Sequence, residues 1–450
     1  MEIRNKANRI RLLNLRTPQM RAFHFSWLAF HLCFFGWFGI APLMAVVRDD
    51  LGLTKTQIGN TIIASVAITI LVRLVMGVLC DRIGPRKAYT WLLCLGSLPV
   101  MGIGLASSFE TFFLARLAIG AIGASFVITQ YHTSVMFAPN VVGTANATSA
   151  GWGNLGGGTT QILMPLIFSG ILMLGVNEAL GWRLAMMVPG VVLFFAGIAY
   201  YRLTQDAPDG NFAELRARGE LAEANGEHGM GASFKAAAKD IRVWALFVVY
   251  AACFGVELTI NNIAAIYFFD NFDLTLATAG MIAGLFGLMN IFARTLGGIF
   301  SDLFARTGGL KGRVRWLFIA MLCEGIALMF FSQMHVLSYA IGIMLVFSLF
   351  VQMAEGATFG VVPFINKKAL GAVAGIVGAG GNAGAVGAGF LFRSETISYQ
   401  QGLFYLGIAV VIASLCALVV RFSTEVEAEE AKAYTDAVGE DTDAGALSLR

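Results

Sequence analysis

Twelve long apolar stretches constrain the fold of this chain more than any other feature. A helix that crosses a bilayer needs about 20 mostly apolar residues, because its backbone polar groups must find partners within the helix. Such stretches lie at 23–47, 56–80, 86–107, 109–137, 143–173 and 183–203, and again at 241–269, 276–304, 314–332, 336–364, 369–393 and 401–421. Only 13% of the residues are charged, about half the usual share of a soluble domain. The sequence predicts an all-α integral membrane protein with 12 transmembrane helices.

The twelve stretches fall into two sets of six. Residues 204–240 between them are charged, polar and rich in glycine, as expected of a cytoplasmic linker. We therefore expect a basic N-terminal segment at 1–22, one six-helix bundle at 23–203 and a second at 241–422. Residues 423–450 are acidic and short of large apolar side chains, so we expect them to be disordered.

The distribution of lysine and arginine predicts the orientation in the membrane. Basic residues gather in 4–21, 82–87, the linker and 306–315, and at Lys367 and Lys368. The loops at the opposite ends of the spans carry few of them. Because basic loops stay on the cytoplasmic side, both termini are expected in the cytoplasm of a protein that crosses the cell membrane many times.

The sequence lacks the features that are usual for several other classes of function. The six cysteines are isolated and form no C-x-x-C pair, so neither a disulfide framework nor a metal site is indicated. A net charge of +3 does not suggest a nucleic-acid partner. The sequence has no nucleophile beside a plausible base, so an enzyme is not indicated, and no cofactor is expected. It also has no large soluble domain, so a membrane sensor is not indicated. The G-x-G-x-x-G match "GWGNLG" at 151–156 lacks the preceding strand of a dinucleotide site.

An internal repeat marks the second helix of each set. The pattern R-x3-G-x3-D occurs as Arg73, Gly77 and Asp81 in the first set, and again from Arg294 to Asp302 in the second. Further along, "GNLGG" at 153–157 is matched by "GNAGA" at 381–385. Many transporters consist of two such repeats, with the substrate at the interface between them.

The two repeated arginines have two interpretations. An arginine deep in a span costs about 3 kcal/mol or more, so each requires compensation. One possibility is an ion pair with an intramembrane carboxylate, for which Glu257, Glu324 and Glu355 are available. The other is an anion shared by the two arginines across the repeat interface. Equivalent positions in two pseudo-symmetric helices favour the shared anion, because guanidinium groups hold oxyanions through paired hydrogen bonds.

Small residues and asparagines accompany this repeat in the fifth and eleventh spans. Glycines recur at helical spacing and predict close helix packing; they are Gly153, Gly156, Gly157, Gly380 and Gly384. Asn154 and Asn382 lie beside them. Each amide is expected either to join neighbouring helices by a hydrogen bond or to serve the anion site.

These segments resemble a known family. "AGWGNLGGGTTQ" at 150–161 and "AGIVGAGGNAGAVGAG" at 374–389 are similar to the paired signature segments of the nitrate/nitrite porters of the major facilitator superfamily. Segments 254–272 and 354–371 resemble the assimilatory branch. The resemblance implies a fold of two pseudo-symmetric six-helix halves.

A further segment, 77–87, resembles the superfamily's loop motif between spans two and three. The gating residues implied by that motif are Gly77, Asp81, Arg82 and Arg86, with Asp302 in the second half. The second-half copy departs from the motif, because an insertion separates Asp302 from the basic residues that follow. This puts strict symmetry of the cytoplasmic gates in doubt.

The resemblance also implies a substrate and a site. In the family two membrane arginines bind nitrate or nitrite, assisted by an aromatic residue of the fourth span, by the signature asparagines and by an aromatic residue of the seventh span. The implied site residues here are Arg73, Arg294, Phe126, Asn154, Asn382 and either Tyr250 or Phe254.

Uptake of a monovalent anion into a negative interior requires coupling, since each 100 mV is worth about 2.3 kcal/mol per charge. Symport with two or more protons and one-for-one nitrate/nitrite exchange both satisfy this requirement. The assimilatory resemblance favours proton symport. Proton-coupling candidates are Glu257, Glu355 and Arg116, each of which has an alternative structural role. The expected partners are the anion, protons and membrane lipid, and the protein is expected to be a monomer.

Overall fold

The computed structural model describes residues 5–137, 139–220, 230–366 and 370–428. The first set of helices comprises α1 (Pro18–Phe38), η1 (Ala41–Leu43), α2 (Met44–Leu51), α3 (Lys55–Ile83), α4 (Pro85–Gly102), η2 (Ile103–Leu105), α5 (Phe109–Ile119), η3 (Gly120–Ala124), α6 (Ser125–Met136), α7 (Pro139–Leu172) and α8 (Glu178–Leu203). The short helices α9 (Phe212–Ala217) and α10 (Met230–Lys239) follow. The second set comprises α11 (Ile241–Phe272), α12 (Leu276–Leu288), η4 (Met289–Ile291), α13 (Ala293–Ser332), α14 (Leu337–Val361), η5 (Val362–Phe364), α15 (Leu370–Phe392) and α16 (Tyr399–Ala417).

The helices account for the predicted membrane spans. The described residues hold eleven helices long and apolar enough to cross a membrane, or twelve if Leu276–Ile291 and Ala293–Ala305, bent by 40°, count as one span. The prediction of an all-α membrane protein is thus confirmed. The proposed limits of the linker and tail stay predictions; most of the tail lies outside the described residues, and 424–428 is helical.

Local signals explain where several helices begin. Thr54 caps α3 together with Gln57, and Ser398 caps α16 in the same way with Gln401; such capping boxes satisfy backbone N–H groups that have no partner in the first turn. Between α3 and α4, Gly84 adopts a φ of 87°, which side-chain-bearing residues rarely adopt, and Pro85 then starts α4. These short connections keep consecutive spans antiparallel.

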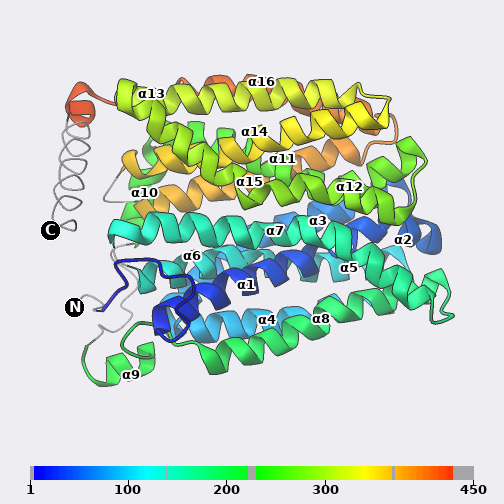
Figure 1. Ribbon diagram of the computed structural model, residues 1–450, viewed down its shortest axis with the longest axis horizontal. Helices are drawn as coiled ribbons and strands as arrows, with labels where there is room; N and C mark the ends of the chain where they lie inside the picture. Colours follow the sequence, from blue (N-terminus) through cyan, green and yellow to red (C-terminus); the bar gives the residue numbers. More distant parts are fainter. Residues whose placement is uncertain (1–4, 138, 221–229, 367–369, 429–450) are drawn as a thin grey trace.

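The two sets form two neighbouring bundles. In Figure 1, α11 to α16 occupy the upper part of the molecule and α1, α4, α5, α6 and α8 the lower part, while both described chain ends and α9 lie at the left. Within the bundles α1 packs on α7, α4 on α8, α11 on α15 and α13 on α14. The bundles meet where α7 packs on α12 and α3 packs on α15.

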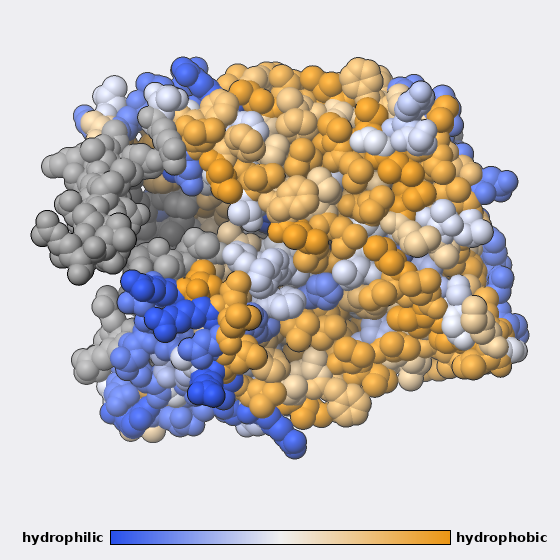
Figure 2. All heavy atoms as spheres, in the orientation of Figure 1, coloured by the Kyte–Doolittle hydropathy of each residue, from blue (hydrophilic) through white to orange (hydrophobic). Residues whose placement is uncertain are grey.

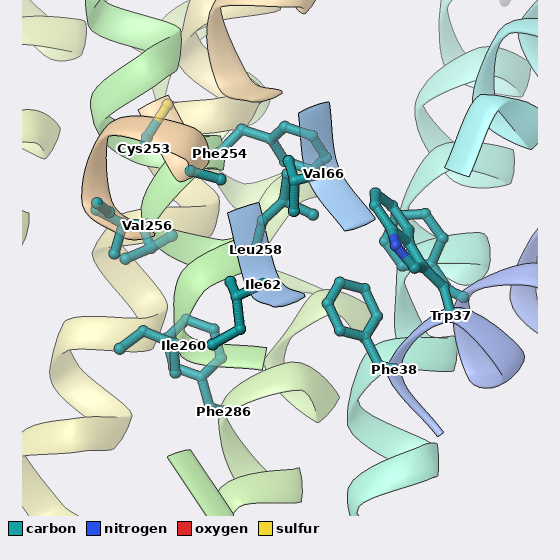
Figure 3. Close-up of a cluster of buried hydrophobic side chains, with 14 of the residues drawn as sticks. Trp37, Phe38, Ile62, Val66, Cys253, Phe254, Val256, Leu258, Ile260 and Phe286 are labelled. Atoms are coloured by element: carbon teal, nitrogen blue, oxygen red, sulfur yellow. The ribbon is translucent and has the colours of Figure 1, made fainter. Parts of the chain in front are cut away.

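Apolar side chains fill the region between the bundles. Figure 3 shows Trp37 and Phe38 of α1 on one side and Phe254 and Leu258 of α11 on the other, with Ile62 of α3 next to Leu258. All five are buried. The outer surface is apolar as well, and Figure 2 shows a broad hydrophobic band between hydrophilic ends. A band of this kind suits contact with lipid rather than water.

Polar contacts join the bundles at the end away from the chain termini. Arg48 of α2 forms an ion pair with Asp270 of α11, with an N–O distance of 2.8 Å. The hydroxyl of Thr56 donates to the Arg393 carbonyl at 2.9 Å, and Arg393 donates to Asn60 at 3.3 Å. The two bundles are therefore held together at this end.

Candidate functional site

Tyr250 contacts one of the two repeated arginines and lies in the neighbourhood of the other. Arg294 lies in the first turn of α13, directly after the break in the helix at Phe292, and its Nη2 donates a hydrogen bond to the Tyr250 hydroxyl at 3.0 Å. Tyr250, on α11, is also within electrostatic range of Arg73 on α3. The fold thus brings one arginine from each bundle to the same tyrosine, although 220 positions separate them in sequence.

Arg73 has unused hydrogen-bonding capacity. Its Nη1 reaches the Gly378 carbonyl only at 3.5 Å. Its Nε and Nη2 are buried and have no hydrogen-bond partner within the described part of the chain. The guanidinium carbon lies 5.5 Å from the centre of the Phe126 ring. Because buried donors rarely lack partners, this guanidinium can accept a ligand.

Arg294 has an acidic partner. Its Nη1 lies 2.6 Å from Oε2 of Glu355 on α14, and the two side chains are 8% and 0% exposed. Close packing makes this pair possible: a Cβ at Gly356 would overlap the Arg294 carbonyl, so glycine lets α14 approach α13. Of the two interpretations of the repeated arginines, the ion pair thus describes Arg294, whereas Arg73 keeps free donors.

Two more buried carboxylates lie in the same bundle. Glu257 of α11 accepts a hydrogen bond from Asn290 Nδ2 at 2.8 Å, and its carboxyl group also lies within hydrogen-bonding reach of Glu355. Glu324 of α13 is fully buried, and neither of its oxygens has a partner there. Both are within electrostatic range of Glu355. Glu355 therefore has one guanidinium and two further carboxyl groups in its surroundings.

The signature asparagines are buried amides. Asn154 of α7 and Asn382 of α15 are 1% and 0% exposed. None of their four polar side-chain atoms has a hydrogen-bond partner within the described residues. The interhelical hydrogen bond that we considered for each is therefore not formed in this structure. An amide buried without partners costs about 1–3 kcal/mol, so these side chains too can accept a ligand.

The glycines place α7 and α15 against equivalent neighbours. A Cβ at Gly153 would overlap the Phe30 ring of α1, and one at Gly381 would overlap Phe254 of α11. One turn further, Gly156 faces the His31 carbonyl and Gly384 faces the Ala251 carbonyl. The repeat in sequence thus corresponds to a repeat in packing.

The remaining predicted glycines also lie at helix contacts. A Cβ at Gly157 would lie 3.0 Å from Asn261 Nδ2, and one at Gly380 would overlap the Phe247 carbonyl. Gly157 therefore faces α11 of the other bundle, whereas Gly380 packs within its own.

Aromatic rings accompany both arginines. The Phe126 ring lies 5.8 Å from that of Phe30, and Tyr250 stacks on Phe254 at 5.2 Å with an interplanar angle of 15°. Sequence reasoning missed Phe30, because it belongs to an aromatic run with no feature that distinguishes one ring from the next. Phe30 is the counterpart of Phe254, because it packs against Gly153 as Phe254 packs against Gly381.

Arg116 has a set of neutral partners. It donates to the Trp37 carbonyl at 3.0 Å, to Asn262 Oδ1 at 3.0 Å and to Ser65 Oγ at 3.3 Å. Asn262 belongs to α11, so this arginine joins the two bundles. None of these partners is acidic, and none is a candidate residue of the anion site.

The cytoplasmic loop motif contacts the start of the linker. Asp206 accepts the backbone N–H of Arg86 at 2.8 Å, and the Arg86 side chain donates to Asn211 at 2.9 Å. Arg82 is exposed, and its carbonyl accepts from Arg216 at 2.6 Å.

The remaining residues that the motif implies are Gly77, Asp81 and Asp302. A Cβ at Gly77 would meet nothing within 4 Å. The Asp81 side chain lies outside the described set. In the second half, Asp302 pairs with Arg313 at 2.6 Å across the insertion, where Gly309 breaks the helix with a φ of 56°.

Comparisons with known proteins agree with this architecture. Residues 26–365 match the Major Facilitator Superfamily. The high affinity nitrate transporter 2.5 of Arabidopsis thaliana is 42% identical over 94% of this chain and 84% of its own length. Nitrate transporter 2.1 of Chlamydomonas reinhardtii is 39% identical over 91% of this chain and 76% of its own. The nitrate/nitrite transporter NrtP of Picosynechococcus sp. is 29% identical over 81% and 83%, respectively.

Solved structures share the fold at low sequence identity. A bacterial homolog of the human lysosomal transporter Spinster, in an inward-facing and occupied conformation, is 15% identical with a TM-score of 0.68 over 89% of this chain and 96% of that one. The nucleoside transporter NupG is 14% identical with a TM-score of 0.62 over 89% and 99%. At such identities the likeness concerns the fold alone.

Proposed function

This chain belongs to the nitrate/nitrite porter family of the major facilitator superfamily, and on this premise we propose that it carries nitrate or nitrite across the cell membrane. The observation that carries the proposal is that Arg73 of the first bundle retains two buried donors without a partner among the described residues, in the neighbourhood of Tyr250, to which Arg294 of the second bundle donates. An anion with several oxygens can use these donors and the Tyr250 hydroxyl together.

The geometry suits a small planar anion. Nitrate and nitrite have oxygens in one plane, which matches the flat donor fork of a guanidinium. Phe126 beside Arg73 and Phe254 beside Tyr250 offer apolar faces. We assign the amides of Asn154 and Asn382 to the same site, because both are buried with unused donors and acceptors. A dicarboxylate would require polar partners for its second carboxylate, and these aromatic rings do not provide them.

We further propose import by alternating access, with proton symport. The two bundles would rock about the anion site. The contacts at the end away from the chain termini, which we name the outer end, would then form and break in turn. Both termini would face the cytoplasm, and the protein would act as a monomer in lipid and leave the ion chemically unchanged. Symport agrees with the carboxylates clustered around Arg294.

Transport into liposomes tests this proposal. Purified full-length protein should take up isotopically labelled nitrate when the outside is acidic, and unlabelled nitrite should compete while succinate should not. A proton uncoupler should abolish accumulation. Uptake that withstands the uncoupler but needs nitrite inside the vesicles would instead identify an exchanger. Protein that binds and moves neither ion would refute the assignment.

A further inference from the structure

Glu355 occupies the position on Arg294 that an anion would need. The carboxylate contacts Nη1, and the Tyr250 hydroxyl already accepts from Nη2. Arg73 has no carboxylate partner among the described residues. An anion that enters between the two arginines would therefore bind Arg73 directly, but it would compete with Glu355 for Arg294.

The surroundings of Glu355 favour binding of a proton. The charged groups within electrostatic range are Arg294 and Glu324 of α13 and Glu257 of α11. The titratable neighbours Tyr250 and Cys253 also lie on α11. All three glutamates are fully buried, and one guanidinium cannot balance three negative charges in a medium of low dielectric constant. Burial of the Glu355 carboxylate beside two further carboxyl groups therefore costs free energy that a bound proton would remove.

We propose that Glu355 is the proton-binding residue that couples proton and anion movement, because its carboxylate and the substrate anion compete for Arg294. This inference rests on the proposed function. A proton from the aqueous phase bonds to the Glu355 carboxylate, the ion pair with Arg294 breaks, and an oxygen of the anion takes the vacated position. In this step one proton and one anion enter the site together, so the charge within the site does not change. Glu355 thus accounts for one of the two or more protons expected in symport.

Glu324 provides a matched control. It lies in the same buried cluster and lacks partners for both oxygens among the described residues, whereas the Arg294 guanidinium contacts Glu355 and Tyr250. A substitution there changes one buried carboxyl of the cluster without changing the competition for Arg294.

Nitrate binding measured by calorimetry between pH 5.5 and 8.5 tests the inference. Affinity of the unmodified protein should weaken with rising pH, approaching about tenfold per pH unit for one linked proton. Glu355→Gln should keep nitrate binding and lose this dependence, and in liposomes it should exchange labelled nitrate without acceleration by a proton gradient. Glu355→Asp and Glu324→Gln should both retain the dependence.

Several results would overturn the inference. The first is a monodisperse Glu355→Gln protein whose nitrate affinity still depends on pH. The second is a monodisperse Glu355→Gln protein that no longer binds nitrate. The third is a Glu324→Gln protein whose nitrate affinity no longer depends on pH. If Glu355→Gln does not fold, the unmodified protein provides the test. It should take up protons when nitrate is added in weak buffer near neutral pH, and absence of this proton uptake would refute the inference. The proposed function itself fails only if the unmodified protein neither binds nor transports nitrate.

Discussion

Arg73 and Arg294 are equivalent in the sequence repeat but differ in their surroundings. Arg294 has Glu355 and Tyr250 as partners, whereas Arg73 has the face of Phe126 and a distant carbonyl. A first-turn position exposes Arg294 to the positive end of the α13 dipole, which disfavours a cation, and this explains why it requires an acidic partner in the absence of substrate. Given this asymmetry, we expect Arg73 rather than Arg294 to attract the proposed anion before the Glu355 ion pair breaks.

Arg73→Lys should weaken nitrate binding at least tenfold, although the charge is kept. Lysine offers a single ammonium group in place of the flat fork, so paired hydrogen bonds and stacking on Phe126 are lost. Binding measured by calorimetry checks this result. Arg202→Lys, at the exposed end of α8, should bind normally, and near-normal affinity of Arg73→Lys would argue against a bidentate role.

Asn382→Ala should separate ligand binding from stability. Because the amide has no partner among the described residues, its removal relieves a desolvation cost of about 1–3 kcal/mol, which offsets the loss of packing. We expect a melting temperature that is unchanged or higher, together with weaker nitrate binding. A clear fall in melting temperature with unchanged affinity would show a structural amide instead.

At the scale of the helices, α7 and α15 act as equivalent packing elements. Gly156 and Gly384 let each helix touch the backbone of the first helix of its own bundle, α1 or α11. Close backbone contact of this type is common in membranes, where apolar side chains gain little by leaving lipid. It also leaves Asn154 and Asn382 buried beside the same contacts, which holds the amides in fixed positions.

Gly384→Val should be destabilising, because the new side chain would overlap the Ala251 carbonyl. Overpacking of this kind costs about 1–3 kcal/mol, and the melting temperature in detergent should fall accordingly. Gly387→Ala, on the same helix, meets nothing within 4 Å and should be nearly neutral. Equal effects of the two substitutions would contradict the packing role of Gly384.

At the scale of the whole molecule, contacts between the bundles gather toward the outer end. The Arg48–Asp270 ion pair and the contacts of Thr56 and Arg393 lie there. Deeper in the molecule, Arg116 joins α5 to Asn262 of α11. Exposed ion pairs contribute only about 0–1 kcal/mol each, so a rocking motion can break those at the outer end at low cost. The structure thus represents a state closed at this end.

A cross-link at the outer end should block transport. Thr56 Oγ1 lies 3.1 Å from Glu395 Oε1 across the two bundles, so cysteines at both positions should be bridged by a short bis-methanethiosulfonate reagent, which spans more than a direct disulfide. In a background whose six native cysteines are replaced, this reagent should abolish nitrate uptake and reduction should restore it. The single variant Thr56→Cys should keep its uptake in the presence of the reagent. Full uptake by the cross-linked protein would exclude alternating access at this end.

The sequence alone determined the membrane spans and the repeat. Both are local properties: an apolar stretch of sufficient length must form a helix in lipid, and R-x3-G-x3-D occurs twice regardless of packing. The candidate residues Arg73, Asn154 and their counterparts could be named on this basis. The break between α12 and α13 could not be located, because no proline marks it.

Only the tertiary structure decided which charges meet. Three glutamates were available to Arg294, and they lie on α11, α13 and α14, up to 98 positions apart in sequence. The choice of Glu355 depends on how closely α14 approaches α13 at Gly356, which is a property of helix packing. Likewise the link from Arg116 to Asn262 exists only because the two bundles meet. An ion pair forms only when two charged groups come within a few ångströms of each other. Residue spacing along separate helices does not specify distances between those helices so closely.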